Sequence, residues 1–184
     1  MASTRRRLKR MPRLKGKKKT QLPVLVGAAP RVAEREGDEL QKIIRTLGGT
    51  TEASKLAKQV MALKPEYPAA SLPELVTFVW LKAYNIPFTF QAMLFGGRRA
   101  KGGLVPDFVI QYGGKGMAWM IQGEYWHDRA TRHGQKDTDV RLRLLGTIYK
   151  GVSISDVVEL WEKDIYRLRP RVFQYALNGI GLRE

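Results

Sequence analysis

The sequence contains no cysteine and only two histidines among its 184 residues. Without cysteine the chain cannot form a disulfide, and zinc sites built from thiolates are excluded. No apolar run approaches the length of about 20 residues that a membrane-spanning helix requires, so we expect a soluble protein with no membrane partner. The basic N-terminus lacks the apolar segment of a secretory signal, and we therefore expect a protein that is not secreted.

Acidic residues are absent from the first twenty positions, which hold ten of the 33 lysines and arginines. The net charge is +16, so the remainder of the chain carries about +6. Such a tail binds polyanions by releasing counterions, and it lacks the apolar helical face that a membrane surface would need. We expect nucleic acid as the partner, and a solvated arm with no single partner is the alternative. The candidate binding residues of the tail are Arg5, Arg6, Arg7, Lys9, Arg10, Lys17, Lys18 and Lys19.

The chain divides into three parts by composition. Residues 1–30 combine the basic run with a proline- and glycine-punctuated link, which predicts a flexible arm that orders only on a partner. Residues 31–70 contain two apolar patterns at helical spacing, over Arg31 to Leu47 and from Thr50 to Leu63, which predict two accessory helices. Residues 71–184 form the remaining domain.

This domain is predicted to be an α/β layer with a mixed central sheet flanked by helices. Its first helix begins at Ser71 with a capping box and ends before Pro87. The terminal helix, Glu162 to Asn178, is expected to be interrupted near Pro170. Between them the patterns predict strands over Phe88–Phe95, Leu104–Ile110, Met117–Gln122 and Val157–Trp161, and a helix over Lys136–Leu145.

Asp107 is the single acid in an otherwise apolar strand-like run. A lone carboxylate there costs several kcal/mol unless a metal, a basic partner or a strand end offsets the burial. The basic partners could come from the preceding glycine-rich loop, where small residues also suit close contact with phosphates. A solvated loop is the alternative for these cations, which are Arg98, Arg99 and Lys101.

The order of these motifs resembles the restriction-endonuclease-like, PD-(D/E)XK superfamily over roughly the last three-fifths of the chain. The segment SLPELVTFVWLKAYNIPFTFQ is similar to the opening helix and first strand, with Glu74 as the acid of the helix. GGLVPDFVI matches the strand that bears the central aspartate, and MIQGEYWH resembles the next strand. KDTDVRLRLL followed by VVELWEKDI resembles the later helix and strand. Within the superfamily the chain looks most like the branch of very-short-patch repair endonucleases and related phage proteins.

The resemblance implies a Mg²⁺ site for phosphodiester hydrolysis, with Asp107 as a metal ligand. The usual pattern places an acid and a lysine on the next strand, where this chain has Met120 and Gln122. The repair branch instead uses a backbone carbonyl and the histidine after the tryptophan. Carried over, these are the carbonyl of Ile121 as second ligand and His127 in proton transfer.

Each of the other candidate residues also has a structural interpretation. Glu74 is either a helper acid or only the capping-box acid of its helix. Gln122 is either a water-mediated metal ligand or a polar residue at a strand end. His127 is either catalytic or a packed loop residue after Trp126.

Three functions remain open on these grounds. The first is a metal-dependent DNA endonuclease or nickase that uses Asp107, His127 and Glu74. The second is a nucleic-acid-binding protein, with DNA as the expected partner, whose endonuclease-like fold has a degenerate metal site. A phage structural component next to packaged DNA and neighbouring subunits would fit it, which implies a cytoplasmic or virion-associated protein. The third is an RNA-associated protein, suggested only by the tail. Met120 and Gln122 favour the second.

Overall fold

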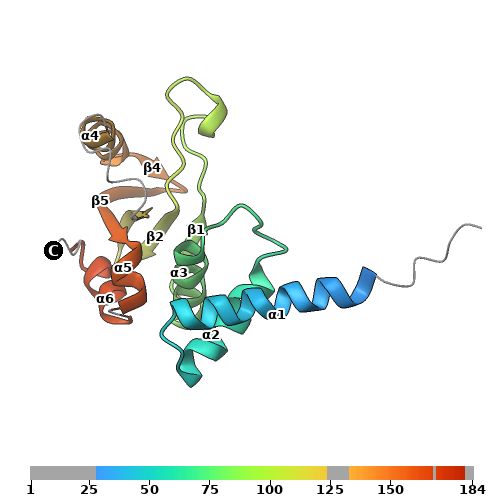
Figure 1. The fold of residues 1–184 in the computed structure, drawn as a ribbon. Helices are drawn as coiled ribbons and strands as arrows, with labels where there is room; N and C mark the ends of the chain where they lie inside the picture. Colours follow the sequence, from blue (N-terminus) through green and yellow to red (C-terminus); the bar gives the residue numbers. More distant parts are fainter. Residues whose placement is uncertain (1–27, 124–132, 168, 181–184) are drawn as a thin grey trace, which may run out of the picture.

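The computed structural model describes residues 28–123, 133–167 and 169–180. Three N-terminal helices precede a five-stranded, curled mixed sheet with further helices on its two faces (Figure 1). None of the described helices is long and apolar enough to cross a membrane. The chain is therefore an α/β protein, as its pattern of helices and strands predicts.

The first two helices, α1 (Ala28–Thr46) and α2 (Thr51–Leu63), begin and end near their predicted bounds. The side chain of Thr50 caps α2 by accepting a hydrogen bond from the backbone N–H of Ala53 at 3.1 Å. Buried side chains of both helices belong to the same hydrophobic cluster as those of α3 (Leu72–Ala83). The two helices thus complete the core beside α3.

The sheet has the strand order β1-β2-β3-β5-β4. β1, β2 and β3 form an antiparallel meander, β5 runs parallel to β3, and β4 pairs antiparallel with β5. The crossover from β3 to β5 contains α4 (His133–Leu144), because parallel strands need a connection of this length. The strands span Phe88–Phe90, Phe108–Tyr112, Lys115–Gln122, Ile148–Tyr149 and Val152–Trp161, in the order β1 to β5.

Helices cover the two faces of the sheet unequally. α3 packs on one face with α5 (Glu162–Arg167) and α6 (Arg171–Leu177), and α4 lies on the other. The break between α5 and α6 at Pro170 confirms the predicted interruption of the terminal helix.

Two predicted strands are shorter than expected, and two, β3 and β5, are longer. β1 ends at Phe90 because Gln91 adopts a positive φ of 48°, which a strand cannot contain. β2 begins only at Phe108, so Asp107 lies directly before the strand and not within it. β5 starts at Val152 and pairs with β4, a strand that was not predicted.

Residues 92–105, which we call the finger, rise away from the sheet between β1 and β2 (Figure 1). A short 3₁₀ helix, η1 (Gly97–Arg99), lies at its tip. Leu94 and Leu104 pair by backbone hydrogen bonds of 2.8 and 2.9 Å, and this bridge holds the two legs of the finger together. The strands predicted over Phe88–Phe95 and Leu104–Ile110 therefore extend too far into the finger.

Candidate functional site

Asp107 stands where the returning leg of the finger enters the sheet. Its Oδ2 atom accepts a hydrogen bond from the backbone N–H of Ile121 on β3 at 2.6 Å. Its own carbonyl accepts one from the backbone N–H of Gln91 at 2.7 Å. The residue is only partly exposed, and the carboxyl is fixed between two strands.

Glu74 reaches the same place from the first turn of α3. The predicted capping box is present: the N–H of Ser71 donates to Oε2 of Glu74 at 2.5 Å, and the N–H of Glu74 donates to Oγ of Ser71 at 3.5 Å. The other carboxylate oxygen accepts a bond from Nε2 of Gln91 at 3.5 Å. Glu74 is buried, at 8% exposure, so this acid lies inside the molecule and not on its surface.

The two carboxyl groups influence each other electrostatically. The pKa of Asp107 is raised to about 7, chiefly by burial and also by the negative charge of Glu74 and a hydrogen bond with it. The N–H of Ile121 and the more distant charge of Arg98 lower the pKa of Asp107. Asp107 and Glu74 therefore form a carboxyl pair in which Asp107 exchanges its proton near neutral pH.

The cations expected to neutralise Asp107 do not form an ion pair with it. Arg98, Arg99 and Lys101 are all exposed on the finger, and no salt bridge joins them to Asp107 in the described part of the chain. Arg98 lowers the pKa of Asp107 only through the longer-range electrostatic effect of its positive charge. Backbone bonding and proximity to a strand end hold the Asp107 carboxyl instead.

A cleft of about 460 Å³ lies next to the carboxyl pair. Gln91 lines it and also bonds to Glu74, which joins the cleft to the pair. The guanidinium groups of Arg98 and Arg99 make its wall cationic, and Met93 and Val105 make part of it apolar. The lining residues are Gln91, Met93, Gly96, Arg98, Arg99 and Val105.

Met120 and Gln122 lie on the face of β3 that α4 covers. Because side chains alternate along a strand, they share this face with Ala118, whose register partner on β2 is Val109. Counted one residue beyond the last register pair, Phe108 and Trp119, Asp107 would be the partner of Met120. Gln122 lines a small depression with Arg141 and Glu159, and no hydrogen bond joins its side chain to that of Asp107, although both are described.

Glu159 was not among the residues singled out from the sequence. It is the register partner of Met120 on β5, so it lies on the same face one strand further from Asp107. Glu159 on β5 thus places an acid beside Met120 on β3, the position at which the endonuclease pattern discussed above has its acid. Only the parallel register between β3 and β5 reveals this, because Glu159 is 39 residues further along the chain than Met120.

The described side chains near Asp107 offer few oxygen ligands for a metal ion. Mg²⁺ takes oxygen ligands in near-octahedral geometry. Asp107 and Glu74 supply two carboxyl groups, and Met120 occupies the place opposite Asp107. Among the described residues no group of three or more acids or histidines is close enough to hold a metal ion. His127 and the candidate residues of the tail, Arg5 to Lys19, lie outside the described residues.

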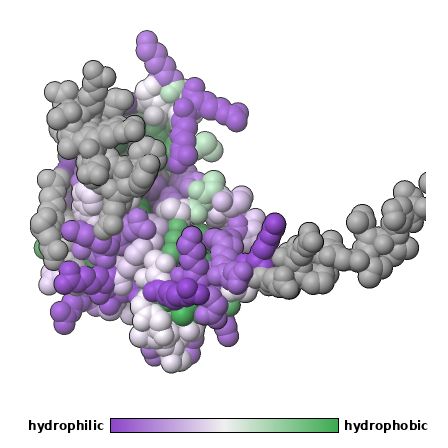
Figure 2. Space-filling view, viewed as in Figure 1, coloured by the Kyte–Doolittle hydropathy of each residue, from purple (hydrophilic) through white to green (hydrophobic). Residues whose placement is uncertain are grey.

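The finger itself is stiffened by contacts with α4. Arg143 donates a hydrogen bond to the carbonyl of Gly102, and its guanidinium lies 5.7 Å from the ring centre of Phe95. Figure 2 shows hydrophilic side chains projecting at the end of the finger. The tip is therefore a braced, cationic projection next to the cleft and the carboxyl pair.

A scan against protein-family models, a search of curated proteins and a search of solved structures each found nothing that matches this chain.

Proposed function

We propose that this protein binds nucleic acid, with DNA as the expected partner, through an endonuclease-like fold whose metal site is degenerate. The observation that carries the proposal is the carboxyl pair of Asp107 and Glu74 beside a cationic cleft, with Met120 in the place of the strand acid. The polar groups suit a phosphate backbone, whereas the donor set falls short of a Mg²⁺ site.

The order of elements supports the endonuclease-like part of the proposal. The resemblance leads us to expect an opening helix with an acid, three strands, a further helix and a last strand. The chain has α3 with Glu74, then β1, β2 and β3, then α4 and β5. Asp107 and Glu74 come together, although 32 residues separate them in the sequence.

The finger and the tail would supply the binding energy. Neutralising phosphates with lysine or arginine releases counterions, so affinity falls steeply with salt. Arg98, Arg99 and Lys101 are exposed together at the tip, and ten further cations lie in the first twenty residues. A structural protein in a phage particle, next to packaged DNA and neighbouring subunits, would need this kind of binding without hydrolysis.

A metal-dependent nickase remains the second candidate because of the raised pKa of Asp107. A carboxyl pair that holds a proton near neutral pH can exchange that proton for a divalent cation. Glu159 and the carbonyl of Ile121 would then be the nearest additional oxygens. This function requires that two carboxylates hold the metal tightly enough for hydrolysis.

One experiment separates the two functions. Supercoiled plasmid is incubated with the protein in Mg²⁺ and in Mn²⁺, and the same samples are run on a retardation gel. The proposal expects retardation without nicking, both for the wild type and for Asp107→Ala. Metal-dependent nicking that disappears in Asp107→Ala would establish the nickase and overturn the proposal.

The contribution of the finger is measured by the salt dependence of DNA affinity. Replacing Arg98, Arg99 and Lys101 by glutamine should flatten the slope of log K against log salt by about 0.9 for each phosphate that is no longer neutralised. A matched control replaces three exposed lysines of the accessory helices, Lys42, Lys55 and Lys58. Equal changes in both variants would mean that only net charge matters and that the finger is not a binding element.

Deleting residues 1–19 tests the tail in the same assay. The truncated chain should keep part of its affinity and lose most of its salt dependence, because ten cations are removed. An unchanged slope would exclude the tail as a DNA-binding segment.

A further inference from the structure

β1 is an edge strand of the sheet, and its outer side is a row of backbone hydrogen-bonding groups. The N–H of Gln91 bonds to the carbonyl of Asp107, and the N–H of Gln111 bonds to the carbonyl of Pro87. These two bonds fix the phase of the β1–β2 ladder, so every second residue of β1 points its backbone toward β2. Phe88 and Phe90 are the alternate residues, and their N–H and C=O groups therefore point away from the sheet.

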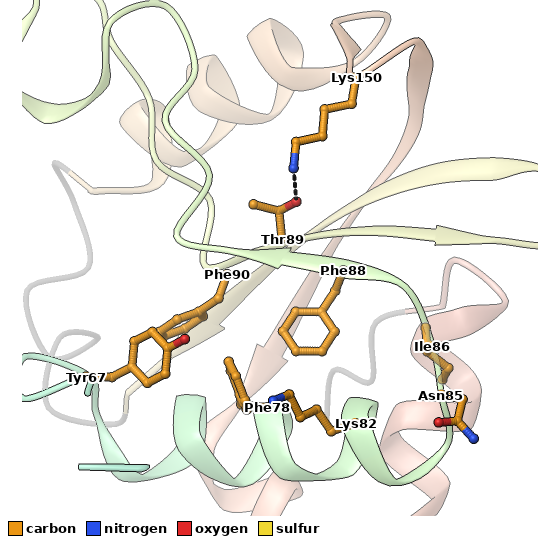
Figure 3. A pocket seen from close by; sticks show the side chains of 9 residues that line it. All are labelled: Tyr67, Phe78, Lys82, Asn85, Ile86, Phe88, Thr89, Phe90 and Lys150. Atoms are coloured by element: carbon orange, nitrogen blue, oxygen red, sulfur yellow. Dashed lines mark hydrogen bonds between the residues drawn. The ribbon is translucent and has the colours of Figure 1, made fainter. Parts of the chain in front are cut away.

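A cavity of about 620 Å³ runs along this free edge (Figure 3). On the α3 side of the strand its wall is aromatic. Phe88 and Phe90 contact the ring of Phe78 edge-to-face, at centroid distances of 5.0 and 5.6 Å. Tyr67 contacts Phe90 in the same way at 5.2 Å. Phe88, Phe90 and Tyr67 remain partly exposed, so an apolar side chain placed there would extend the aromatic cluster.

The opposite side of the strand is polar and cationic. Lys150, at the turn between β4 and β5, reaches across to β1 and donates a hydrogen bond to Oγ1 of Thr89 at 3.2 Å. Figure 3 shows Thr89 and Lys150 on one side of β1 and the aromatic rings on the other. A second exposed ammonium group, that of Lys82, lies on the aromatic side of the strand, 5.2 Å from the ring centre of Phe78 (Figure 3). No carboxylate is among the described residues that line the cavity.

We propose that the β1 edge is a strand-addition site for an extended acidic peptide segment of another protein, with apolar and acidic residues in alternation. Such a segment would pair its backbone with the outward groups of Phe88 and Phe90. Because its side chains alternate, one set packs on the aromatic rings and the other faces Lys150. This partner is separate from the nucleic acid proposed above, and the site does not use Asp107 or the finger.

Two other occupants fit the edge less well. The basic N-terminal tail of this chain has the same sign of charge as Lys82 and Lys150. Single-stranded nucleic acid matches the charge but has no peptide groups for the outward N–H and C=O of β1. The ring contacts are already edge-to-face within the cluster, and Phe78 is buried at 4% exposure, so its ring is not a stacking platform for a base.

The test uses the full chain and a fluorescent six-residue peptide of alternating valine and glutamate, measured by anisotropy at physiological salt. The control peptide has the same composition with its valines and glutamates in two blocks. We expect the alternating peptide to bind at least about tenfold more tightly, because only its order fits both sides of the strand. Equal binding of the two peptides would overturn the proposal, since it would show attraction by net charge alone.

Two variants of equal charge change locate the binding. Lys150→Glu should weaken binding of the alternating peptide by about tenfold, whereas Lys101→Glu on the finger should leave the affinity for this peptide unchanged. Equal losses in both variants would overturn the site. A fluorescent single-stranded oligonucleotide serves as a third probe. The proposal would fail if Lys150→Glu lost oligonucleotide binding, Lys101→Glu kept it, and the peptide did not compete with the oligonucleotide. The edge would then be a nucleic-acid site.

Backbone pairing is tested with two N-methylated forms of the alternating peptide, each methylated on one set of alternate amides. An added strand points one set toward β1 and the other toward solvent. One form should therefore lose binding while the other keeps it. Loss in both forms, or in neither, would contradict strand addition. An increase in the mass of the protein in solution that the peptide reverses would show that a second copy occupies the edge, and this would overturn the proposal.

Discussion

The two faces of the sheet differ in how much apolar material covers them. On the α3 face twenty buried residues form one cluster, which includes Trp119, Phe108 and Phe173. On the α4 face seven buried residues form a smaller cluster of aliphatic side chains. Met120, Gln122 and Glu159 are all assigned to this thinner face by alternation and register. The thick face thus provides the stability, and the thin face leaves room for polar groups.

The largest expected effect on stability comes from replacing two neighbouring residues of β3 whose side chains lie on opposite faces of the sheet. Trp119 is fully buried against Phe173, and Trp119→Ala should lower the free energy of unfolding by about 3–5 kcal/mol. Met120 is only partly buried, and Met120→Ala should cost less than about 2 kcal/mol. Urea unfolding measures both, and Trp119→Phe serves if the alanine variant does not fold. Equal losses would show that the two faces contribute alike.

The next largest effect on stability is expected from replacing a glycine of the finger or a glycine of the hairpin between β2 and β3. A Cβ atom at Gly103 would lie 1.8 Å from the carbonyl oxygen of Gly97, so Gly103→Ala must displace the tip of the finger. Gly114 has open space around it but a φ of +75° in the tight turn between β2 and β3. Gly103→Ala should lower the free energy of unfolding by about 1–3 kcal/mol and weaken DNA binding. Gly114→Ala should lower it by about 1 kcal/mol and leave DNA binding unchanged. Unchanged DNA affinity in Gly103→Ala would mean that the shape of the finger is irrelevant to binding.

The ends of the helices could be predicted from the sequence, whereas the ends of the strands could not. Thr50 and Ser71 mark the starts of their helices because a cap is a local contact within four residues. β1 stops at Gln91 because of a backbone conformation that its side chain does not reveal. β4 has two residues and exists only by pairing with β5, so no local pattern marks it.

The candidate site could be predicted only in part, for the same reason. Asp107 is conspicuous as an acid among apolar neighbours, and Glu74 as the acid of a capping box. That they lie together depends on how α3 sits against β2, which is a tertiary contact. Gln91 and Glu159 gave no signal, since a glutamine after a strand and a glutamate within one are ordinary. Their positions follow from the turn at Gln91 and from the β3–β5 register.

The carboxyl pair predicts a dependence of stability on pH. The pKa of Asp107 in the folded protein is about 7, above the value of about 3.9 for an unfolded chain. Between these two values the folded state binds more protons than the unfolded state, so this group's contribution is fully present below pH 4 and is lost as pH rises through 7. Asp107→Asn keeps an acceptor for the N–H of Ile121 and removes the titration. Relative to the wild type it should therefore become more stable as pH is raised from 5 to 8. A constant difference across this range would show that Asp107 does not titrate there.

The smallest effect compares two helix caps, one inside the site and one outside it. Ser71→Ala and Thr50→Ala each remove a capping hydroxyl, and each should cost about 1 kcal/mol in urea unfolding. Only Ser71 belongs to the capping box that holds Glu74, whose carboxylate raises the pKa of Asp107. Ser71→Ala should thus also shift the pH at which Asp107 titrates, followed by NMR of its carboxyl carbon, whereas Thr50→Ala should not. Equal titrations in the two variants would mean that the capping box stabilises α3 without positioning the carboxyl pair. Glu74 would then be held by the backbone N–H of Ser71, which the alanine variant keeps, together with Gln91 and burial.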